Sequence, residues 1–198
     1  ICTYFEIKLV RAMHQTLLKN KNRCVCVGSR GHGDSHGWES EVSKANGDKM
    51  MLWSSLSSDM KHVANTLFPS IRKPMPYLAS SKQCKYICCG NSMSSAASLW
   101  FAVQHPEEVA AVVMIRPPTA WQTRAAQRQR LLKTAETLPE PMKYIVRGTA
   151  YSDLPSTQVL RARVKCPVLL LAVQHDPIHP ESTAVDIKNA LGELAELH

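Results

Sequence analysis

Three kinds of pattern are absent from this 198-residue sequence, and each absence excludes a class of protein. No apolar run is long enough to cross a bilayer, so we expect no membrane span. Seven cysteines are present without a single Cys-x-x-Cys pair, which argues against a zinc site. Zinc-finger spacing, an aromatic RNA-binding signature and a glycine-rich phosphate loop are also missing. We therefore expect no nucleic-acid partner, and we attribute the net charge of +8 to a solvated surface.

The cysteines lie mainly in apolar stretches. Cys24 and Cys26 alternate within one such stretch, and Cys88 and Cys89 lie together in another. An odd number of thiols in buried strands is typical of a reducing compartment, where cysteine acts as a small apolar residue. We therefore expect a cytoplasmic protein or one from another reducing compartment. A targeting peptide is not assessable, because the chain begins with Ile1 inside a helical pattern that continues to residue 18.

What the sequence does contain is a set of short apolar runs that each end in a polar loop. The runs are residues 23–27 (RCVCV), 85–89 (KYICC) and 167–173 (PVLLLAV). Their composition predicts buried strands, because short β-branched and apolar runs bounded by turn residues favour that structure. In open parallel sheets, ligands bind beyond the carboxyl ends of the strands. The loops after these runs are therefore expected to meet at one site.

One of these loops carries the sequence's most specific signal. Residues 85–104, KYICCGNSMSSAASLWFAVQ, pass from an apolar run directly into a helical pattern. A serine at such a tight bend is lifted above the sheet, and the helix dipole behind it favours negative charge. The bend needs small residues two places before and after the serine, and Gly90 and Ser94 occupy those places. Ser92 is therefore a candidate nucleophile, for which we expect a positive φ, and the alternative interpretation is an ordinary serine-rich junction.

Together these segments resemble the α/β-hydrolases. The resemblance rests on RGHGDS at 30–35, GNSMS at 90–94, HPE at 105–107 and HDPIHP at 175–180, which follow one another in the family's order and at about its spacing. Residues 115–126, IRPPTAWQTRAA, also resemble a subgroup of enol-lactonase-like and haloperoxidase-like serine hydrolases. The resemblance implies an α/β fold with a mostly parallel sheet, flanking helices and a small helical cap.

The same resemblance implies a division of the chain into core and cap. Residues 1–118 and 166–198 would form the core, and residues 119–165 would form the cap. We expect N-terminal strands and the last strand-helix unit of the fold to be missing, so we interpret the sequence as a partial chain. The alternative is a natural protein that was shortened to a non-catalytic remnant.

Site residues follow from the resemblance position by position. Ser92 corresponds to the family's nucleophile, Met93 to the residue whose amide contributes to the oxyanion hole, and Asp176 to the acid. The family's histidine usually follows one further strand, which here barely begins at residues 195–198. His179, three residues after Asp176, is a candidate replacement base. The other interpretation is that His179 caps or hydrogen-bonds the helix that follows it.

Two more histidines lie near expected loops. His198 stands at the start of the last expected strand, where its direction would be set by strand parity, and it is the weaker candidate for the base. His32 lies in the RGHGDS loop, where we expect it to be held by neighbouring amides and to be structural.

Two functions are compatible with these observations. The first is a serine hydrolase that acts on a small-molecule carboxylic ester or lactone through an acyl-enzyme at Ser92, without a metal or organic cofactor. The second is a non-catalytic relative that serves as a binding or assembly subunit, which Ser94 and the missing family histidine favour. Neither candidate function determines the oligomeric state or the acyl group of the substrate.

Periodicity predicts the flanking helices. Helical spacing runs over residues 5–18, 50–67, 124–138 and 156–163. Apolar side chains in the cap could line a substrate pocket, although this spacing is also typical of simple packing. They are Trp121, Leu131, Leu132, Met142, Tyr144 and Ile145.

Overall fold

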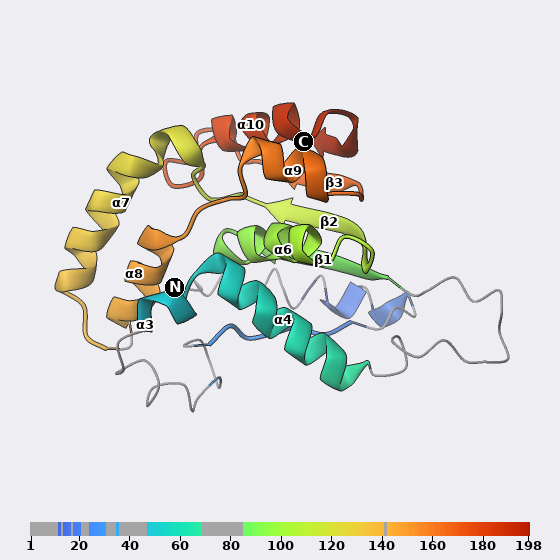
Figure 1. The fold of residues 1–198 in the computed structure, drawn as a ribbon, viewed down its shortest axis with the longest axis horizontal. Coiled ribbons are helices and arrows are strands. Elements are labelled where there is room, and N and C mark those ends of the chain that lie inside the picture. The colour runs from blue at the N-terminus through green and yellow to red at the C-terminus, as the bar shows by residue number, and fades with distance from the viewer. Residues whose placement is uncertain are drawn as a thin grey trace, which may run out of the picture.

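A parallel β-sheet forms the centre of the molecule (Figure 1). The computed structural model describes residues 12, 14–16, 18–20, 24–30, 35, 47–68, 85–140 and 142–198. Within these residues the sheet has four strands in the order β1-β2-β3-β4, and each neighbouring pair is parallel. The strands are β1 (Tyr86–Asn91), β2 (Val109–Ile115), β3 (Val168–Leu171) and β4 (Ala195–Leu197). The predicted α/β architecture with a parallel sheet is confirmed.

The register of the sheet decides which loops meet. Asn91 at the end of β1 is paired with Ile115 of β2, and Ile115 is paired with Leu171 at the end of β3. The three strands therefore end level with one another. The residues that follow them leave the sheet at one edge, where the sequence predicted that a site would form.

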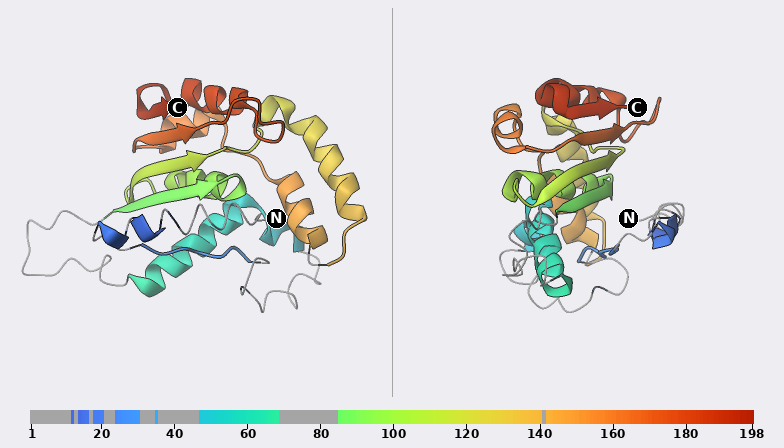
Figure 2. Two further views of the ribbon diagram at one scale, coloured as in Figure 1. Left: turned by 180° about the vertical axis from the view of Figure 1, so that it is seen from behind. Right: turned by 90° about the vertical axis from the view of Figure 1, so that its right-hand side faces the viewer.

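Helices cover one face of the sheet and close its core (Figure 2). Helix α6 (Met93–Gln104) packs on β1 and β2, and α10 (Glu181–Leu191) packs on β3 and β4. Helix α9 (Thr157–Arg163) lies between α6 and α10, and α4 (Trp53–Leu67) packs beside α6. The buried faces are apolar, with Leu99 and Phe101 of α6 at 0% and 1% exposure. A short helix η1 (Gly192–Leu194) then leads into β4.

Two helices lie beyond the carboxyl end of the sheet, in the region predicted to form the cap (Figure 1). They are α7 (Trp121–Glu136) and α8 (Met142–Tyr151), which pack against each other. Helix α8 also contacts the short helix α3 (Gly47–Met50). Gly148 makes this approach close, because a Cβ there would lie 2.2 Å from the Met51 Cβ.

A buried arginine links α7 to α4. Arg124 of α7 is 2% exposed, its Nε donates to the Ser152 carbonyl, and its guanidinium lies 4.6 Å from the centre of the Trp53 ring. Burial lowers the pKa of Arg124 to about 10, which still leaves the side chain charged at neutral pH. The charge is balanced by carbonyl oxygens, by the aromatic face of Trp53 and by the negative charge of Asp153.

Some predicted elements are wrong. Residues 24–27 of the predicted strand 23–27 are outside any strand, and Val25 and Val27 are about 40% exposed (39% and 41%). A strand requires a hydrogen-bonded neighbour, and the pairing of the described sheet does not include this segment. As a result Cys26 is exposed, as is Cys89 on β1, contrary to the expectation of buried thiols, whereas Cys88 and Cys166 are buried.

The predicted helices agree better with the structure than the predicted strand at residues 23–27. Residues 12, 14–16 and 18 are helical as predicted, and the remainder of 5–18 lies outside the described residues. The pattern at 50–67 is divided between α3 and α4, because the chain turns at Met51 and Leu52. Helix α8 was not predicted. Its Ile145 packs with Met51 rather than lining a pocket, with Met142 and Tyr144 beside them.

Candidate active site

Ser92 occupies the sharp bend between β1 and α6. Its backbone has φ 53° and ψ −121°, a left-handed φ that a non-glycine residue adopts only under constraint. The bend is fixed from the neighbouring strand, because the Ser92 N–H donates to the Ile115 carbonyl of β2 at 2.9 Å. The positive φ predicted for this serine is confirmed.

Two small residues make this bend possible. A Cβ on Gly90 would lie 2.2 Å from the Ser94 carbonyl oxygen, so any side chain there would collide with the first turn of α6. Ser94 stands where the related motif has a second glycine, and its hydroxyl has a structural role. It donates to the Asn91 carbonyl at 2.8 Å and accepts from the Asn91 N–H at 2.9 Å. Ser94 therefore closes the bend instead of widening it.

His179 lies directly beside this serine. Its Nε2 is 2.7 Å from the Ser92 Oγ, and its Nδ1 is 3.1 Å from the Asp176 Oδ2. The exposed fractions are 7% for the His179 side chain and 11% for the Asp176 side chain. When the neutral ring carries its proton on Nδ1, it donates to the carboxylate and Nε2 accepts from the serine hydroxyl. The structure thus brings together the three side chains that the sequence singled out.

A compact turn allows an acid and a histidine three residues apart to face one another. The Asp176 Oδ1 accepts from the backbone N–H of Ile178 at 2.8 Å and of His179 at 3.0 Å. Asp side chains commonly bond the backbone two residues ahead in this way. The turn follows His175, whose φ is 59°. Helix α10 begins after Pro180, and the two ring nitrogens of His179 face Asp176 and Ser92.

The same bonds set the ionisation of Asp176. Partial burial would raise its pKa, but the backbone N–H groups of His179 and Ile178 and the His179 ring outweigh burial and hold the pKa below its ordinary value. A carboxyl with a depressed folded-state pKa adds stability at pH values above its unfolded pKa. That contribution is lost as the pH falls through the folded-state pKa.

A pH titration of stability should detect this contribution. We expect Asp176→Asn to lower the free energy of unfolding at pH 7, and the difference from the parent to shrink as the pH falls below about 4. Asn is the matched replacement because its Oδ1 still accepts from the two backbone N–H groups. Urea unfolding at several pH values measures the effect, with Asp186→Asn on α10 as the control. A difference that stays constant with pH would contradict the proposed ionisation.

Arg116 is a site residue that sequence reasoning missed. It follows β2, and its Nε lies 3.6 Å from the Asp176 Oδ2, the oxygen that also faces the imidazole. The signal that could have found it is its position, because it directly follows a strand at the edge where Ser92 emerges. The next loop residues reinforce the contact, since the Thr119 hydroxyl lies 3.5 Å from the Ile178 carbonyl.

Met93, the candidate for the oxyanion hole, is the first residue of α6. The N–H groups in the first turn of a helix have no partner within the helix, and they carry the positive end of the helix dipole. The Met93 side chain turns toward the cap, where its Sδ is 3.7 Å from the Thr149 hydroxyl. The geometry therefore leaves the Met93 amide, but not its side chain, at the bend beside Ser92.

His198, the weaker candidate for the base, does not join this group. His198 is 60% exposed and its Nε2 is 2.6 Å from the Glu196 Oε1, at the β4 side of the sheet. His32 lies outside the described residues. Among the described residues, no group of three or more His, Cys, Asp or Glu side chains is arranged to hold a metal ion. No helix within the described ranges is both long and apolar enough for a membrane span.

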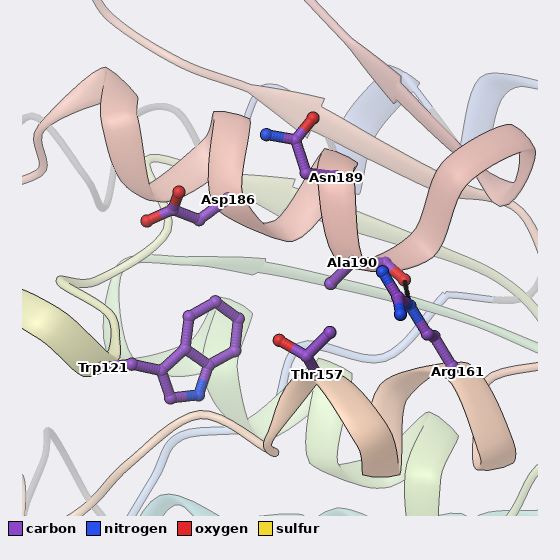
Figure 3. A pocket seen from close by; sticks show the side chains of 6 residues that line it. All are labelled: Trp121, Thr157, Arg161, Asp186, Asn189 and Ala190. Atoms are coloured by element: carbon purple, nitrogen blue, oxygen red, sulfur yellow. Dashed lines mark hydrogen bonds between the residues drawn. The ribbon is translucent and has the colours of Figure 1, made fainter.

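A shallow cavity of about 280 Å³ lies away from this group, between α9 and α10 (Figure 3). Trp121 forms one wall, and Arg161 is tethered there by its Nε, which donates to the Ala190 carbonyl at 3.1 Å. Thr157, Asp186 and Asn189 complete the lining. Since Ser92, Asp176 and His179 are not part of this lining, we do not assign the cavity to the same site.

Comparisons with known proteins agree with this architecture. No family model and no curated protein sequence matches the chain. Among solved structures, an esterase from Exiguobacterium antarcticum is similar with a TM-score of 0.66 and 14% identity, over 96% of this chain and 77% of that chain. A carboxylesterase structure from Nitrososphaera gargenis has a TM-score of 0.61 and 18% identity, over 95% and 74%.

A third similar structure is BpoC from Mycobacterium tuberculosis, which is described as a non-heme bromoperoxidase. Its TM-score is 0.66 at 13% identity, over 93% of this chain and 74% of that chain. The chain also spans 62% of the length of a thermophilic esterase from Thermogutta terrifontis. Likeness at these identities shows the fold alone. These neighbours are members of the α/β-hydrolase fold, and this chain has the same fold.

Proposed function

We propose that this chain, whose fold is that of the α/β-hydrolases, is a serine hydrolase that cleaves carboxylic esters or lactones through an acyl-enzyme at Ser92. The observation that carries the proposal is the hydrogen-bonded series from the Ser92 Oγ through both nitrogens of His179 to the Asp176 carboxylate, at 2.7 and 3.1 Å. A serine hydroxyl is a weak nucleophile unless a base lies within hydrogen-bond reach, and here one does.

The proposed reaction begins at the serine hydroxyl. His179 Nε2 accepts the Ser92 proton as the Oγ attacks the ester carbonyl, and Asp176 stabilises the resulting imidazolium through Nδ1. The positive end of α6 and the Met93 N–H favour the negative charge that develops on the carbonyl oxygen. The imidazolium then protonates the leaving alkoxide. Water, activated by the same histidine, releases the acid and restores Ser92.

The structural neighbours support an ester as the class of substrate. Esterases and a carboxylesterase are among the solved structures that this chain resembles, which supports an ester bond as the target. A lactone is an internal ester, so the same attack opens it. The location of the site beyond the carboxyl ends of the strands is where open α/β sheets commonly bind small molecules.

The non-catalytic alternative has lost the two observations that favoured it. Ser94 closes the bend with hydrogen bonds to Asn91 and does not relax the φ of Ser92. A histidine also lies at hydrogen-bonding distance from the serine, supplied by the loop after β3. A binding or assembly role would not require this contact.

Active-site labelling tests the proposal. We expect a fluorophosphonate probe to label the protein covalently at Ser92, because the activated Oγ attacks its phosphorus. Ser92→Ala should abolish labelling and the hydrolysis of p-nitrophenyl acetate together. The control is Ser58→Ala on α4, which removes an exposed hydroxyl outside the site. Equal labelling of the parent and Ser92→Ala would reject the proposal, and mass spectrometry of the labelled peptide locates the modified residue.

A further inference from the structure

We propose that Arg116 is a positioning residue that holds the Asp176 carboxylate in the orientation that the His179 imidazole requires. This inference rests on the proposed function of Ser92, His179 and Asp176. It concerns a residue that does not touch Ser92 and would act through the acid.

The backbone of Arg116 is unusual and firmly placed. Its φ is 50°, in the left-handed region that long side chains rarely adopt. Its N–H donates to the Leu171 carbonyl of β3 at 2.8 Å, so the residue bridges the ends of β2 and β3. Such backbone strain persists only where the surroundings enforce it, and it occurs often at active sites. The described part of the chain has three non-glycine residues with positive φ, namely Ser92, Arg116 and His175. Ser92 and Arg116 directly follow β1 and β2, and His175 lies four residues after the end of β3.

The Arg116 side chain lies near the carboxylate oxygen of Asp176 that faces the His179 ring. The Arg116 Nε is 3.6 Å from the Asp176 Oδ2, while the His179 Nδ1 is 3.1 Å from the same oxygen. The other oxygen, Oδ1, is held by the backbone N–H groups of Ile178 and His179. The turn therefore fixes one carboxylate oxygen without help, and the guanidinium lies against the oxygen that orients the imidazole.

The contact acts through geometry more than through net attraction. A separation of 3.6 Å is an ion-pair distance rather than a short hydrogen bond, and the Arg116 side chain is 29% exposed. Solvent weakens the attraction in such a pair. A guanidinium beside Oδ2 nevertheless restricts the position that this oxygen can take, and a small displacement of a catalytic group can lower the rate by about 100-fold.

Steady-state kinetics on ester hydrolysis test the inference. We expect Arg116→Asn to lower kcat about 10- to 100-fold with little change in KM, because the residue acts on the acid and not on the bound substrate. Asn is chosen because it tolerates a left-handed φ. Arg116→Lys should retain more of kcat, since it keeps the positive charge. Arg130→Gln on α7 controls for the loss of a cation elsewhere.

A double-mutant cycle separates positioning from a merely structural role. If Arg116 acts through Asp176, the Arg116→Asn substitution should cause almost no further loss of kcat in a protein that already carries Asp176→Asn. An equal fold-change in both backgrounds, a rise in KM with kcat unchanged, or an unaltered kcat in Arg116→Asn would each overturn the inference. Fluorophosphonate labelling of the parent at Ser92 is measured in parallel. If the parent protein were not labelled at Ser92, that result would contradict the proposed function rather than the role of Arg116.

Discussion

His179→Asn is expected to lower kcat for p-nitrophenyl ester hydrolysis by about 10⁴-fold or more, because it removes the base that lies 2.7 Å from the Ser92 Oγ. Without a base, the hydroxyl at this bend keeps its proton at neutral pH. Fluorophosphonate labelling should fall in parallel, since it depends on the same activated oxygen. KM should change far less than kcat, because His179 contacts the reacting oxygen rather than a remote part of the substrate.

The same loop supplies a matched control. His175 is exposed and has φ 59°, a conformation that Asn tolerates, so His175→Asn changes the same residue type four positions away without strain. We expect its kcat to stay close to that of the parent. If both variants lost activity equally, the effect would belong to the loop as a whole. If His179→Asn kept its activity, another residue would have to be the base.

Gly90→Ala is expected to destabilise the protein by about 3 kcal/mol or more and to abolish labelling of Ser92 in any folded fraction. The added Cβ would lie 2.2 Å from the Ser94 carbonyl oxygen and 2.5 Å from the Ser95 nitrogen. Both atoms belong to the backbone of the first turn of α6, so neither can move away as a flexible side chain would. Relief requires α6 to shift away from β1, which would move Ser92 away from His179.

The comparison for this variant is Gly192→Ala. Gly192 has φ 60°, and a Cβ added there would meet nothing within 4 Å. Alanine at that position suffers only the conformational penalty, about 1 to 2 kcal/mol, and the site should be unaffected. Urea unfolding gives the free energies, and labelling of the folded protein gives the state of the bend. A Gly90→Ala protein as stable and as reactive as the parent would contradict the packing described here.

The sequence was informative wherever the chemistry depends on local geometry. A bend with small residues two places on either side of Ser92 needs only its neighbours to form, and the motif therefore predicted the positive φ. The end of β3 could be predicted to within two residues for the same reason, since the apolar run 167–173 is followed by a polar loop and the strand ends at Leu171. The meeting of Ser92 and Asp176 at one edge then follows from the parallel order of the strands.

What the sequence could not settle depends on long-range packing. An imidazole three residues after an acid can face the acid, the solvent or the next helix, and the outcome here is set by the Asp176 Oδ1, which bonds two backbone N–H groups. For residues 23–27, the local composition led to a wrong prediction. Its composition is typical of a buried strand, but composition does not supply the hydrogen-bonded neighbour that a strand requires.

Placing the acid and the base on one turn changes how thermal motion affects them. The His179 N–H donates to the Asp176 Oδ1 and the His179 ring faces the Asp176 Oδ2, so a fluctuation of the loop after β3 carries both side chains in the same direction. Their mutual distance is therefore protected, whereas their joint distance from Ser92 is not. Loop motion would switch the nucleophile on and off as a whole, without an intermediate in which the imidazole has lost its carboxylate but kept its serine.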